Sequence, residues 1–258
     1  MTSTEMVVVG MKYIASVSFG KDSLAMLLRL MEENWPLDIV VFYNTGMEFD
    51  SIYAIRDKVK PMLANRKIKF VELSPKEPFL YSMLERPVKF RSKEGFHYGF
   101  GWCGGPCRWG TSEKLRAIKI FKKSLGEPTI DYVGIAADEP TRFKKASQEG
   151  KTLPLVQWGM TEKDCLQYCY DRGFHWVEKA ANAGTAYIDL YTVLDRVSCW
   201  CCCNKNLKEL RNIYSHLPQY WDRLKILQQQ IDRPFKGYYK GRPNGIFELE
   251  KRFLQEQL

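Results

Sequence analysis

The sequence predicts an α/β protein with a doubly wound, mostly parallel sheet and a helical, cysteine-containing C-terminal part. Two observations predict this class. Strand-like and helix-like segments alternate over about the first 135 residues, and hydrophobic residues recur at helical spacing from about residue 206 onward. At 258 residues with 45% hydrophobic content, the chain can bury one substantial core with a smaller appended part. We therefore expect a main domain at 1–198 and a cysteine-loop and helical region at 199–258 packed on it.

The elements of the first part follow from local composition. The segment 37–43 is almost continuously apolar, which is typical of a parallel strand covered on both faces. Strands and helices that alternate along the chain form a doubly wound sheet, which binds its ligand at the carboxyl ends of the strands. The sequence therefore predicts a ligand site there. Between 75 and 101, prolines and glycines interrupt any period, so we expect an irregular and functional segment there. The expected strands are 13–15, 37–43, 68–73 and 130–135, and the expected helices are 24–31, 51–64 and 112–123.

The segment 16–23, Ser-Val-Ser-Phe-Gly-Lys-Asp-Ser, joins the first strand to the first helix. The first N–H groups of a helix lack internal partners and the helix dipole is positive there, so this turn predicts an anion site. Ser18 and Ser23 add hydroxyl donors and Lys21 adds a positive charge. Gly20 permits close backbone approach, and Asp22 is suited to orient a donor or hold Mg²⁺. Together these groups suit a polyphosphate; the alternative is a simple helix cap.

The six residues 18–23 resemble the pyrophosphate loop, S-x-G-K-D-S, of the ATP pyrophosphatase (PP-loop) superfamily, whereas neither a Walker loop nor G-x-G-x-x-G is present. That superfamily includes phosphoadenosine-phosphosulfate reductases, tRNA thiolases and DNA phosphorothioation enzymes. The resemblance implies an adenine nucleotide alpha hydrolase-like fold, ATP and Mg²⁺ as ligands, and attack on the α-phosphate while the loop holds the β,γ-phosphates. The ATP contacts that it implies in this loop are Ser16, Ser18, Phe19, Gly20, Lys21, Asp22 and Ser23.

Two further segments carry the same resemblance. Residues 44–49, Asn-Thr-Gly-Met-Glu-Phe, resemble the D-T-G-x-E turn after the second strand, with Asn44 in place of the usual Asp. This turn adds Thr45, Gly46 and Glu48 to the implied ATP contacts. Residues 153–164 resemble the P-L-x-x-W-x-x-x-D element, in which Thr161 is a good N-cap for the helix that follows.

Residues 134–142 resemble the G-x-R-x-x-E-x-x-R segment of the superfamily, in which acidic and basic groups flank the nucleotide or substrate. Ala136 stands where many relatives have Arg. The resemblance implies that Asp138, Glu139 and Arg142 act with Lys21 and Asp22 in catalysis. Arg142 is suited to bind a phosphate bidentately.

The eight cysteines are clustered, which in an intracellular chain indicates metal binding or catalysis rather than a disulfide framework. Two cysteine pairs supply four thiolates, which suit tetrahedral Zn²⁺ or a [4Fe-4S] cluster. The alternative is a metal site with a purely structural role. Resemblance to the G-C-x-x-C-P element of iron-sulfur relatives favours the cluster. Cys201 and Cys203 remain as a sulfur carrier or alternative ligand, and Cys165 and Cys169 are expected to be buried apolar side chains. The expected metal ligands are Cys103, Cys107, Cys199 and Cys202.

The formal net charge is +9, and residues 204–243 contain nine basic and three acidic residues, a net charge of +6. Within 233–242, basic residues alternate with Phe235, Tyr238 and Tyr239. Phosphate contacts and base stacking need this combination, so we expect a nucleic-acid acceptor. The alternative is an ordinary solvated face.

These features favour an ATP pyrophosphatase that adenylates an acceptor, with DNA or tRNA as acceptor and a cysteine desulfurase as sulfur donor. The main alternative is a sulfonucleotide reductase that releases sulfite, and a non-enzymatic iron-sulfur nucleotide sensor is a third. Lys21 and Asp22 are intact and no cysteine follows Cys203, and both features favour the pyrophosphatase. Neither a signal-like start nor an apolar run of about 18 residues occurs, so we expect a cytoplasmic protein without a membrane partner.

Overall fold

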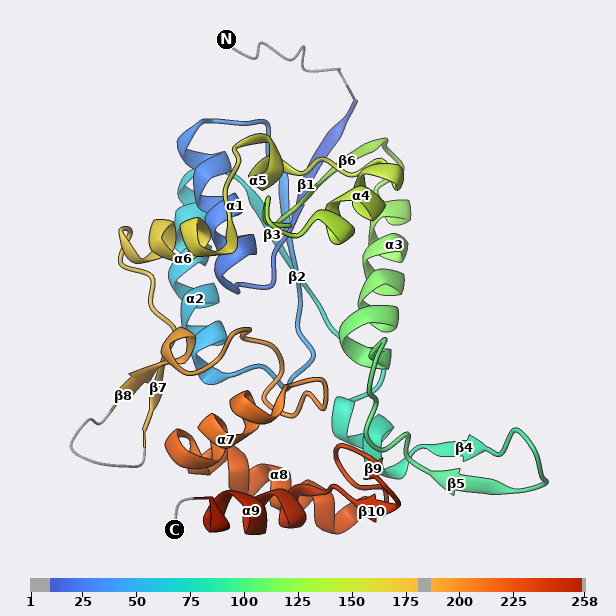
Figure 1. The fold of residues 1–258 in the computed structure, drawn as a ribbon. Coiled ribbons are helices and arrows are strands. Elements are labelled where there is room, and N and C mark those ends of the chain that lie inside the picture. Colours follow the sequence, from blue (N-terminus) through green and yellow to red (C-terminus); the bar gives the residue numbers. More distant parts are fainter. Residues whose placement is uncertain (1–9, 181–186, 257–258) are drawn as a thin grey trace. The chain divides into compact units, whose positions relative to one another are not determined.

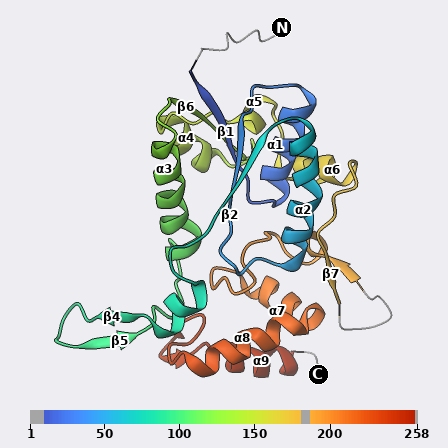
Figure 2. The same cartoon turned by 180° about the vertical axis from the view of Figure 1, so that it is seen from behind.

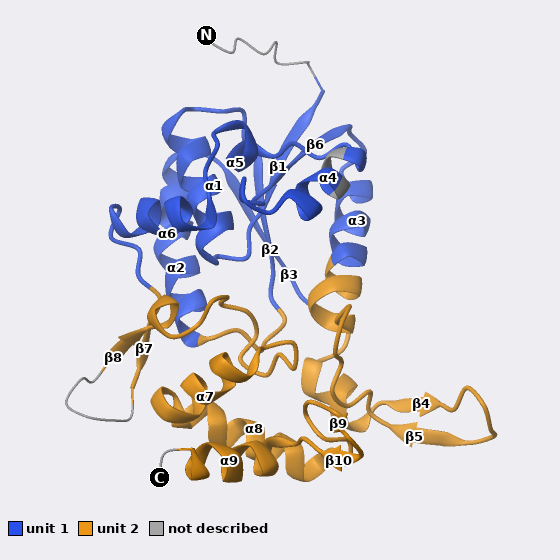
Figure 3. Cartoon of the chain, in the orientation of Figure 1, with its two compact units in different colours: residues 1–44, 50–74, 115–175 blue, residues 45–49, 75–114, 176–258 orange. Residues whose placement is uncertain are grey.

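The computed structural model describes residues 10–180 and 187–256, and of residues 145 and 147 only the backbone (Figure 1). The chain forms two compact units (Figure 3). Unit 1 comprises residues 1–44, 50–74 and 115–175, and unit 2 comprises 45–49, 75–114 and 176–258. The units interleave along the chain, whereas the sequence suggested a linear division at residue 198.

Unit 1 is built on a sheet of four parallel strands in the order β3-β2-β1-β6. All five residues of β2 are buried, as its continuous apolar sequence predicted. In the register, Ile14 of β1 pairs with Ile39 on one side and Asp131 on the other. The parallel sheet predicted from the sequence is confirmed. Its strands are β1 (Lys12–Ser16), β2 (Ile39–Tyr43), β3 (Lys69–Leu73) and β6 (Thr129–Val133).

Helices cover both faces of this sheet, as a doubly wound fold requires (Figures 1 and 2). Ile118 and Phe121 of α3 pack against a buried cluster that includes Ile14 and Val41. The opposite face carries α1, α2 and α6, as both views show. The helices of unit 1 are α1 (Lys21–Glu32), α2 (Asp50–Asn65), α3 (Lys114–Ser124), α4 (Pro140–Gln148), α5 (Pro154–Gln157) and α6 (Glu162–Tyr170).

Unit 2 has a helical core with an aromatic interior. Phe49 meets Tyr220 edge to face at 4.7 Å between ring centroids, and Trp221 lies 5.8 Å from Phe253. Tyr220 and Leu224 of one C-terminal helix and Leu210 and Ile213 of another are buried at helical spacing, so the amphipathic C-terminal helices are confirmed. They are α7 (Leu207–His216), α8 (Pro218–Gln230) and α9 (Ile246–Gln255).

Three short hairpins and three short helical turns complete unit 2 as far as it is described. One turn is the 3₁₀ segment η3 (Leu190–Thr192), and the other two are the π-helical turns described below. The hairpins pair β4 (Pro87–Lys89) with β5 (Phe96–Tyr98), β7 (Val177–Lys179) with β8 (Tyr187–Asp189), and β9 (Tyr238–Tyr239) with β10 (Arg242–Pro243).

Two expectations about the middle of the chain need correction. The segment 75–101 is not irregular throughout, because it contains the π-helical turn η1 (Tyr81–Glu85) and the β4–β5 hairpin. Its glycines serve this geometry: a Cβ at Gly99, where φ is +68°, would lie 2.1 Å from the carbonyl oxygen of Met83. The helix expected at 112–123 begins instead as the π-helical turn η2 (Arg108–Glu113), which α3 continues.

Candidate functional site

The loop at 16–23 lies where the sequence places it, between β1 and α1 of unit 1. Its left-handed residue is Phe19, with φ of 59°, whereas Gly20 has an ordinary φ of −76° and is the N-cap of α1. The ring of Phe19 is fully buried and lies 5.1 Å from the ring of Phe42. Burial of the ring offsets the cost of the strained backbone. Phe19 therefore offers a ligand its backbone rather than its side chain. The close approach of a ligand to Gly20, which needs no unusual φ, stays a prediction.

Two serine hydroxyls close the loop at the start of α1. The backbone N–H of Ser18 donates to Oγ of Ser23 at 3.1 Å, and the two Oγ atoms are also 3.1 Å apart. The backbone after β6 approaches closely here, since a Cβ at Gly134 would lie 2.8 Å from the Cα of Ser23. Only glycine fits at residue 134 without a shift of α1, so this close approach helps to fix the position of the serine hydroxyls.

Lys21 is buried, at 7% exposure, and its charge is balanced by carboxylates. Its Nζ lies 2.5 Å from Oε2 of Glu162 and 3.5 Å from Oδ1 of Asp22. Glu162 is the first residue of α6, where Thr161 and Asp164 form a capping box as the sequence predicted. Sequence reasoning missed Glu162, because it lies 141 residues from Lys21 and its only local signal is that of a helix start.

The environment of Asp22 changes its acidity. Burial raises the pKa of its carboxyl to about 6, with Glu162 and Glu139 adding to the rise and Lys21 opposing it. Asp22 therefore titrates near neutral pH in this structure. A divalent cation bound beside it would favour the carboxylate form.

The three residues of the 134–142 segment that were expected to be catalytic have defined partners in unit 1. Oδ1 of Asp138 accepts a hydrogen bond from the backbone N–H of Glu162 at 3.0 Å, so Asp138 helps to position α6. Nη1 of Arg142 donates to the carboxylate of Glu139, three residues earlier. A phosphate would have to share Arg142 with Glu139. The catalytic roles of Asp138, Glu139 and Arg142 stay predictions.

The turn at 45–48 belongs to unit 2, where it binds the second cysteine loop. Oγ1 of Thr45 donates to Oε1 of Glu48 at 2.8 Å, and Sγ of Cys199 lies 3.5 Å from the same oxygen. Glu48 is half-buried, and burial of its carboxyl raises its pKa above the ordinary value. Gly46 has φ of 79°, which glycine adopts without strain. The side chains of Thr45 and Glu48 therefore fix Cys199, and their predicted contacts with ATP stay predictions.

The two cysteine loops of unit 2 lie side by side and are joined through Asn204. Its Oδ1 accepts from the backbone N–H of Gly105 at 2.8 Å, and its Nδ2 donates to the carbonyl of Gly105 at 2.9 Å. Such a reciprocal pair uses both sides of an amide group and fixes the separation of the loops. The structure thus brings the two predicted cysteine pairs into one region without a metal.

Within this region the neighbours of each thiol differ from the pairing expected. Burial and the neighbouring thiols of Cys202, Cys107 and Cys103 together raise the pKa of Cys203 to about 11. Burial also raises the pKa of Cys199, whose Sγ lies 3.5 Å from Oε1 of Glu48. A Cβ at Gly104, in the first cysteine loop, would lie 4.0 Å from Sγ of Cys203, so Cys203 lies beside that loop.

The donor set can be compared with the metals that the sequence suggested. Among the described residues, no three Cys, His, Asp or Glu side chains are close enough to hold one metal ion, and all eight cysteines are free thiols. A zinc site with bonds of about 2.3 Å to sulfur is thus not preformed here. The thiols of 103–107 and 199–203 are the donors that either Zn²⁺ or an iron-sulfur cluster would use.

Cys165 and Cys169 behave as expected, since both are fully buried in α6. Sγ of Cys169 donates to the backbone carbonyl of Lys21 at 3.5 Å. Burial raises the pKa of both thiols well above the ordinary value. They act as small apolar side chains that pack α6 against α1.

The basic and aromatic segment 233–242 divides into buried and exposed parts. Tyr238 and Tyr239 are 68% and 67% exposed, but Phe235 is only 3% exposed and lies 4.7 Å from the ring of Trp102. The expectation that Phe235 stacks on a base is therefore wrong. Lys205 is also buried, so the net charge of +6 overstates the charge on the surface.

Comparison with known proteins gives three matches. Residues 12–86 match the model of the phosphoadenosine phosphosulfate reductase domain family. An uncharacterized protein of Methanocaldococcus jannaschii is 22% identical over 230 residues, which cover 81% of this chain and 40% of that protein. The chain thus spans less than half the length of that relative. The solved structure of the U34-tRNA thiolase NcsA from Methanococcus maripaludis with its [4Fe-4S] cluster matches with a TM-score of 0.45 and 13% identity, covering 96% of this chain and 72% of that chain.

Among the described residues, none of the helices is both long and apolar enough to span a membrane. The segment that matches the family model contains β1, the loop 16–23 and β2, which together position the anion site. The similarity to the phosphoadenosine phosphosulfate reductase domain family thus covers the part of the chain that carries the loop 16–23.

Proposed function

We propose that this protein is an ATP pyrophosphatase that adenylates an acceptor and supports sulfur transfer to it. The loop 16–23 carries the proposal. A buried lysine, two serine hydroxyls and the first N–H groups of α1 converge there, within the segment that matches the reductase domain family. These groups match the charge and hydrogen-bonding needs of the β,γ-phosphates of ATP.

Polyphosphate binding requires Lys21 to exchange or share its present partner. Its ammonium group has three donors, so it can bond a phosphate oxygen while it keeps Glu162, or it can release Glu162. Asp22 and Glu162 are the carboxylates beside it that could hold the Mg²⁺ that accompanies ATP. Mg²⁺, when bound, would neutralise charge on the phosphates. Lys21 would then stabilise the negative charge that develops as pyrophosphate leaves.

The cysteine loops of unit 2 are the proposed source of sulfur chemistry. A [4Fe-4S] cluster, when bound, would supply redox and sulfur-binding chemistry there, and Zn²⁺ would supply a structural link. The chain's own residues prepare the region, since Asn204 joins the two loops and Glu48 fixes Cys199. We propose a cysteine desulfurase as the sulfur donor, as the family resemblance implies.

The acceptor that we propose is nucleic acid, and two hairpins of unit 2 support it. The β9–β10 hairpin exposes Tyr238 and Tyr239 next to Lys240 and Arg242. The β4–β5 hairpin exposes Phe96 and Tyr98, at 62% and 74%, and residues 86–98 contain four basic residues and one acid. Exposed aromatic rings among cations suit base stacking and phosphate contacts. The sequence alone predicts only an irregular segment where the β4–β5 hairpin lies.

The matched family favours one alternative, the reduction of an adenylated sulfate to sulfite. The position of Lys21 supports the pyrophosphatase instead. An adenylated sulfate has no β,γ-phosphates, so a buried lysine at the start of α1 would have no corresponding group to bind.

Release of pyrophosphate from ATP in the presence of tRNA or duplex DNA tests the proposal. Lys21→Ala should slow release by about 10²–10³-fold, since one preorganised charge donor is lost. Lys119→Ala removes an exposed lysine of α3 and serves as the control, with release unchanged. Undiminished release in Lys21→Ala would contradict the assignment, and release of sulfite from an adenylated sulfate by the wild type would favour the reductase.

A further inference from the structure

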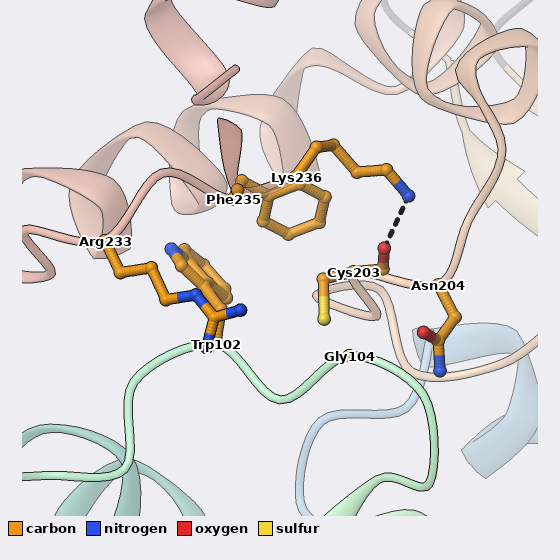
Figure 4. Close-up of a pocket in the computed structure, with 8 residues that line it drawn as sticks. Trp102, Gly104, Cys203, Asn204, Arg233, Phe235 and Lys236 are labelled. Atoms are coloured by element: carbon orange, nitrogen blue, oxygen red, sulfur yellow. Dashed lines mark hydrogen bonds between the residues drawn. The ribbon is translucent and has the colours of Figure 1, made fainter. Parts of the chain in front are cut away.

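We propose that a pocket in unit 2 binds a small tetrahedral oxyanion, of the phosphate or thiosulfate type, beside the thiol of Cys203. The pocket has a volume of about 230 Å³, and its walls include Trp102, Cys203, Arg233, Phe235 and Lys236 (Figure 4). The loop 16–23 belongs to unit 1, whereas all residues that line this pocket belong to unit 2, so the two sites share no residue. The proposal does not depend on the ATP chemistry.

The polar groups around the pocket are mainly donors of positive charge. Arg233 and Lys236 both line it, and none of its eight lining residues is acidic. Nζ of Lys236 donates to the carbonyls of Cys203 at 2.7 Å and Lys205 at 2.9 Å, which leaves one of its three N–H donors for a ligand. Arg233 is exposed and forms no ion pair among the described residues. Its planar group can bind two oxygens of one anion.

The wall of the pocket also contains a buried donor. Trp102 is 3% exposed, and its indole Nε1 has no hydrogen-bond partner among the described residues. An unpaired buried N–H costs about 1–3 kcal/mol, so such groups are rare in folded proteins. Less than 1 Å² of this nitrogen is accessible, so an acceptor oxygen in the pocket would satisfy it after a small shift of the wall.

The size of the pocket selects among anions. Pockets that bury drug-sized ligands measure roughly 300–1,000 Å³, so a volume of about 230 Å³ is small for a nucleotide. It suits a tetrahedral anion with its remaining water. The oxyanion has two possible sources, a free inorganic ion or the phosphate of a nucleic-acid strand, and the same groups would recognise both.

Isothermal titration calorimetry on the full chain tests the site with inorganic phosphate, thiosulfate and a 5′-phosphorylated dinucleotide as separate ligands. We expect saturable binding with a millimolar or lower dissociation constant. Arg233→Gln should weaken it by about tenfold or more, since a charge-assisted bidentate contact is lost. Lys251→Gln makes the same charge change outside the pocket, on the exposed face of α9, and should leave affinity unchanged. Trp102→Phe removes the N–H and keeps an aromatic ring, so it should also weaken binding.

The three ligands separate the possible sources. Binding of phosphate and thiosulfate, with loss in Arg233→Gln, supports a site for a free oxyanion. Binding of the dinucleotide alone, with the same loss, supports a site for a nucleic-acid phosphate. Absence of binding by all three at millimolar concentration overturns the proposal, as does equal affinity in Arg233→Gln and Lys251→Gln. Arg233 is exposed, so its variant should fold even if Trp102→Phe does not.

Discussion

Nζ of Lys21 lies 2.5 Å from Oε2 of Glu162, so the loop lysine is paired with a carboxylate from a helix 141 residues away. Both side chains lie in unit 1, and Lys21 is almost completely buried. An anion that binds the loop must therefore compete with Glu162 or share Lys21 with it. This relationship makes the affinity of the loop for phosphates depend on a residue outside the sequence motif.

Replacement of Glu162 tests this competition. Glu162→Gln removes one negative charge beside the anion site and keeps the shape of the side chain. We expect metal-free pyrophosphate to bind several-fold more tightly, because a repulsion of about 1 kcal/mol or more is removed. Calorimetry in the presence of a chelator measures this. Lys163→Gln, at the next and exposed position, serves as the control for a general charge effect. Weaker pyrophosphate binding in Glu162→Gln would contradict the competition.

The raised pKa of Asp22, about 6 against an ordinary 3.8, predicts a pH dependence of stability. Between about pH 4 and 6 the folded protein binds more protons at this group than the unfolded chain does. Its contribution to stability is therefore lost as pH rises through 6. Asp22→Asn should be more stable than the wild type at pH 7, by at most about 3 kcal/mol, and the difference should shrink toward pH 4.

Denaturant unfolding of both proteins between pH 4 and 8 measures this difference. Asp164→Asn replaces an exposed carboxyl whose pKa is lowered by its hydrogen bonds to Thr161, so it should show the opposite sign. The same Asp22→Asn protein should release pyrophosphate more slowly, since the carboxylate proposed to hold Mg²⁺ is lost. A constant difference in stability at all pH values would mean that Asp22 has an ordinary pKa.

Metal content identifies the ligands of the cysteine region. Cys103→Ser and Cys107→Ser should each lose most of the bound iron or zinc, because a missing thiolate opens the site. Cys165→Ser should keep its metal, since Cys165 lies buried in α6 of unit 1. Elemental analysis and visible absorbance of anaerobically purified protein measure both. Full metal in the Cys103 variant would show that the first loop is not a ligand loop.

The same measurement decides the remaining ligands. The sequence-based set contains Cys199 and Cys202, whereas the structure places Cys203 beside the first cysteine loop and Cys199 against Glu48. Loss of metal in Cys199→Ser, with retention in Cys203→Ser, would support the sequence-based set. The reverse result would support Cys203 as the ligand.

Salt dependence tests the proposed nucleic-acid surface. Lys240→Gln combined with Arg242→Gln should weaken binding of tRNA and duplex DNA alike. The slope of log K against log salt should become shallower by the amount that corresponds to the loss of about 2 phosphate contacts. Lys236 is not included, because its ammonium group bonds two backbone carbonyls. Lys119→Gln with Lys123→Gln makes the same charge change on α3 and serves as the control. Fluorescence anisotropy across salt concentrations measures the slopes, and equal slopes in both double variants would exclude this hairpin.

The sequence alone determined those strands, helix starts and loops that depend on interactions between neighbouring residues. The apolar run at 37–43 predicted a strand buried on both faces, and Thr161 with Asp164 predicted the start of α6. Each depends on residues within one turn or one strand, where local hydrogen bonding and periodicity decide the outcome. The position of the loop 16–23 between β1 and α1 was predicted for the same reason.

Tertiary structure alone decided the contacts between segments far apart in the chain. The pairing of Lys21 with Glu162, the binding of Cys199 by Glu48 and the joining of Gly105 to Asn204 have no local signal. The burial of single side chains also could not be predicted from the sequence. Phe235 and Tyr238 lie three residues apart in one aromatic and basic segment, yet Phe235 packs on Trp102 and Tyr238 is exposed. Composition gives the charge of a side chain, but its solvation and partners arise only when the whole chain packs.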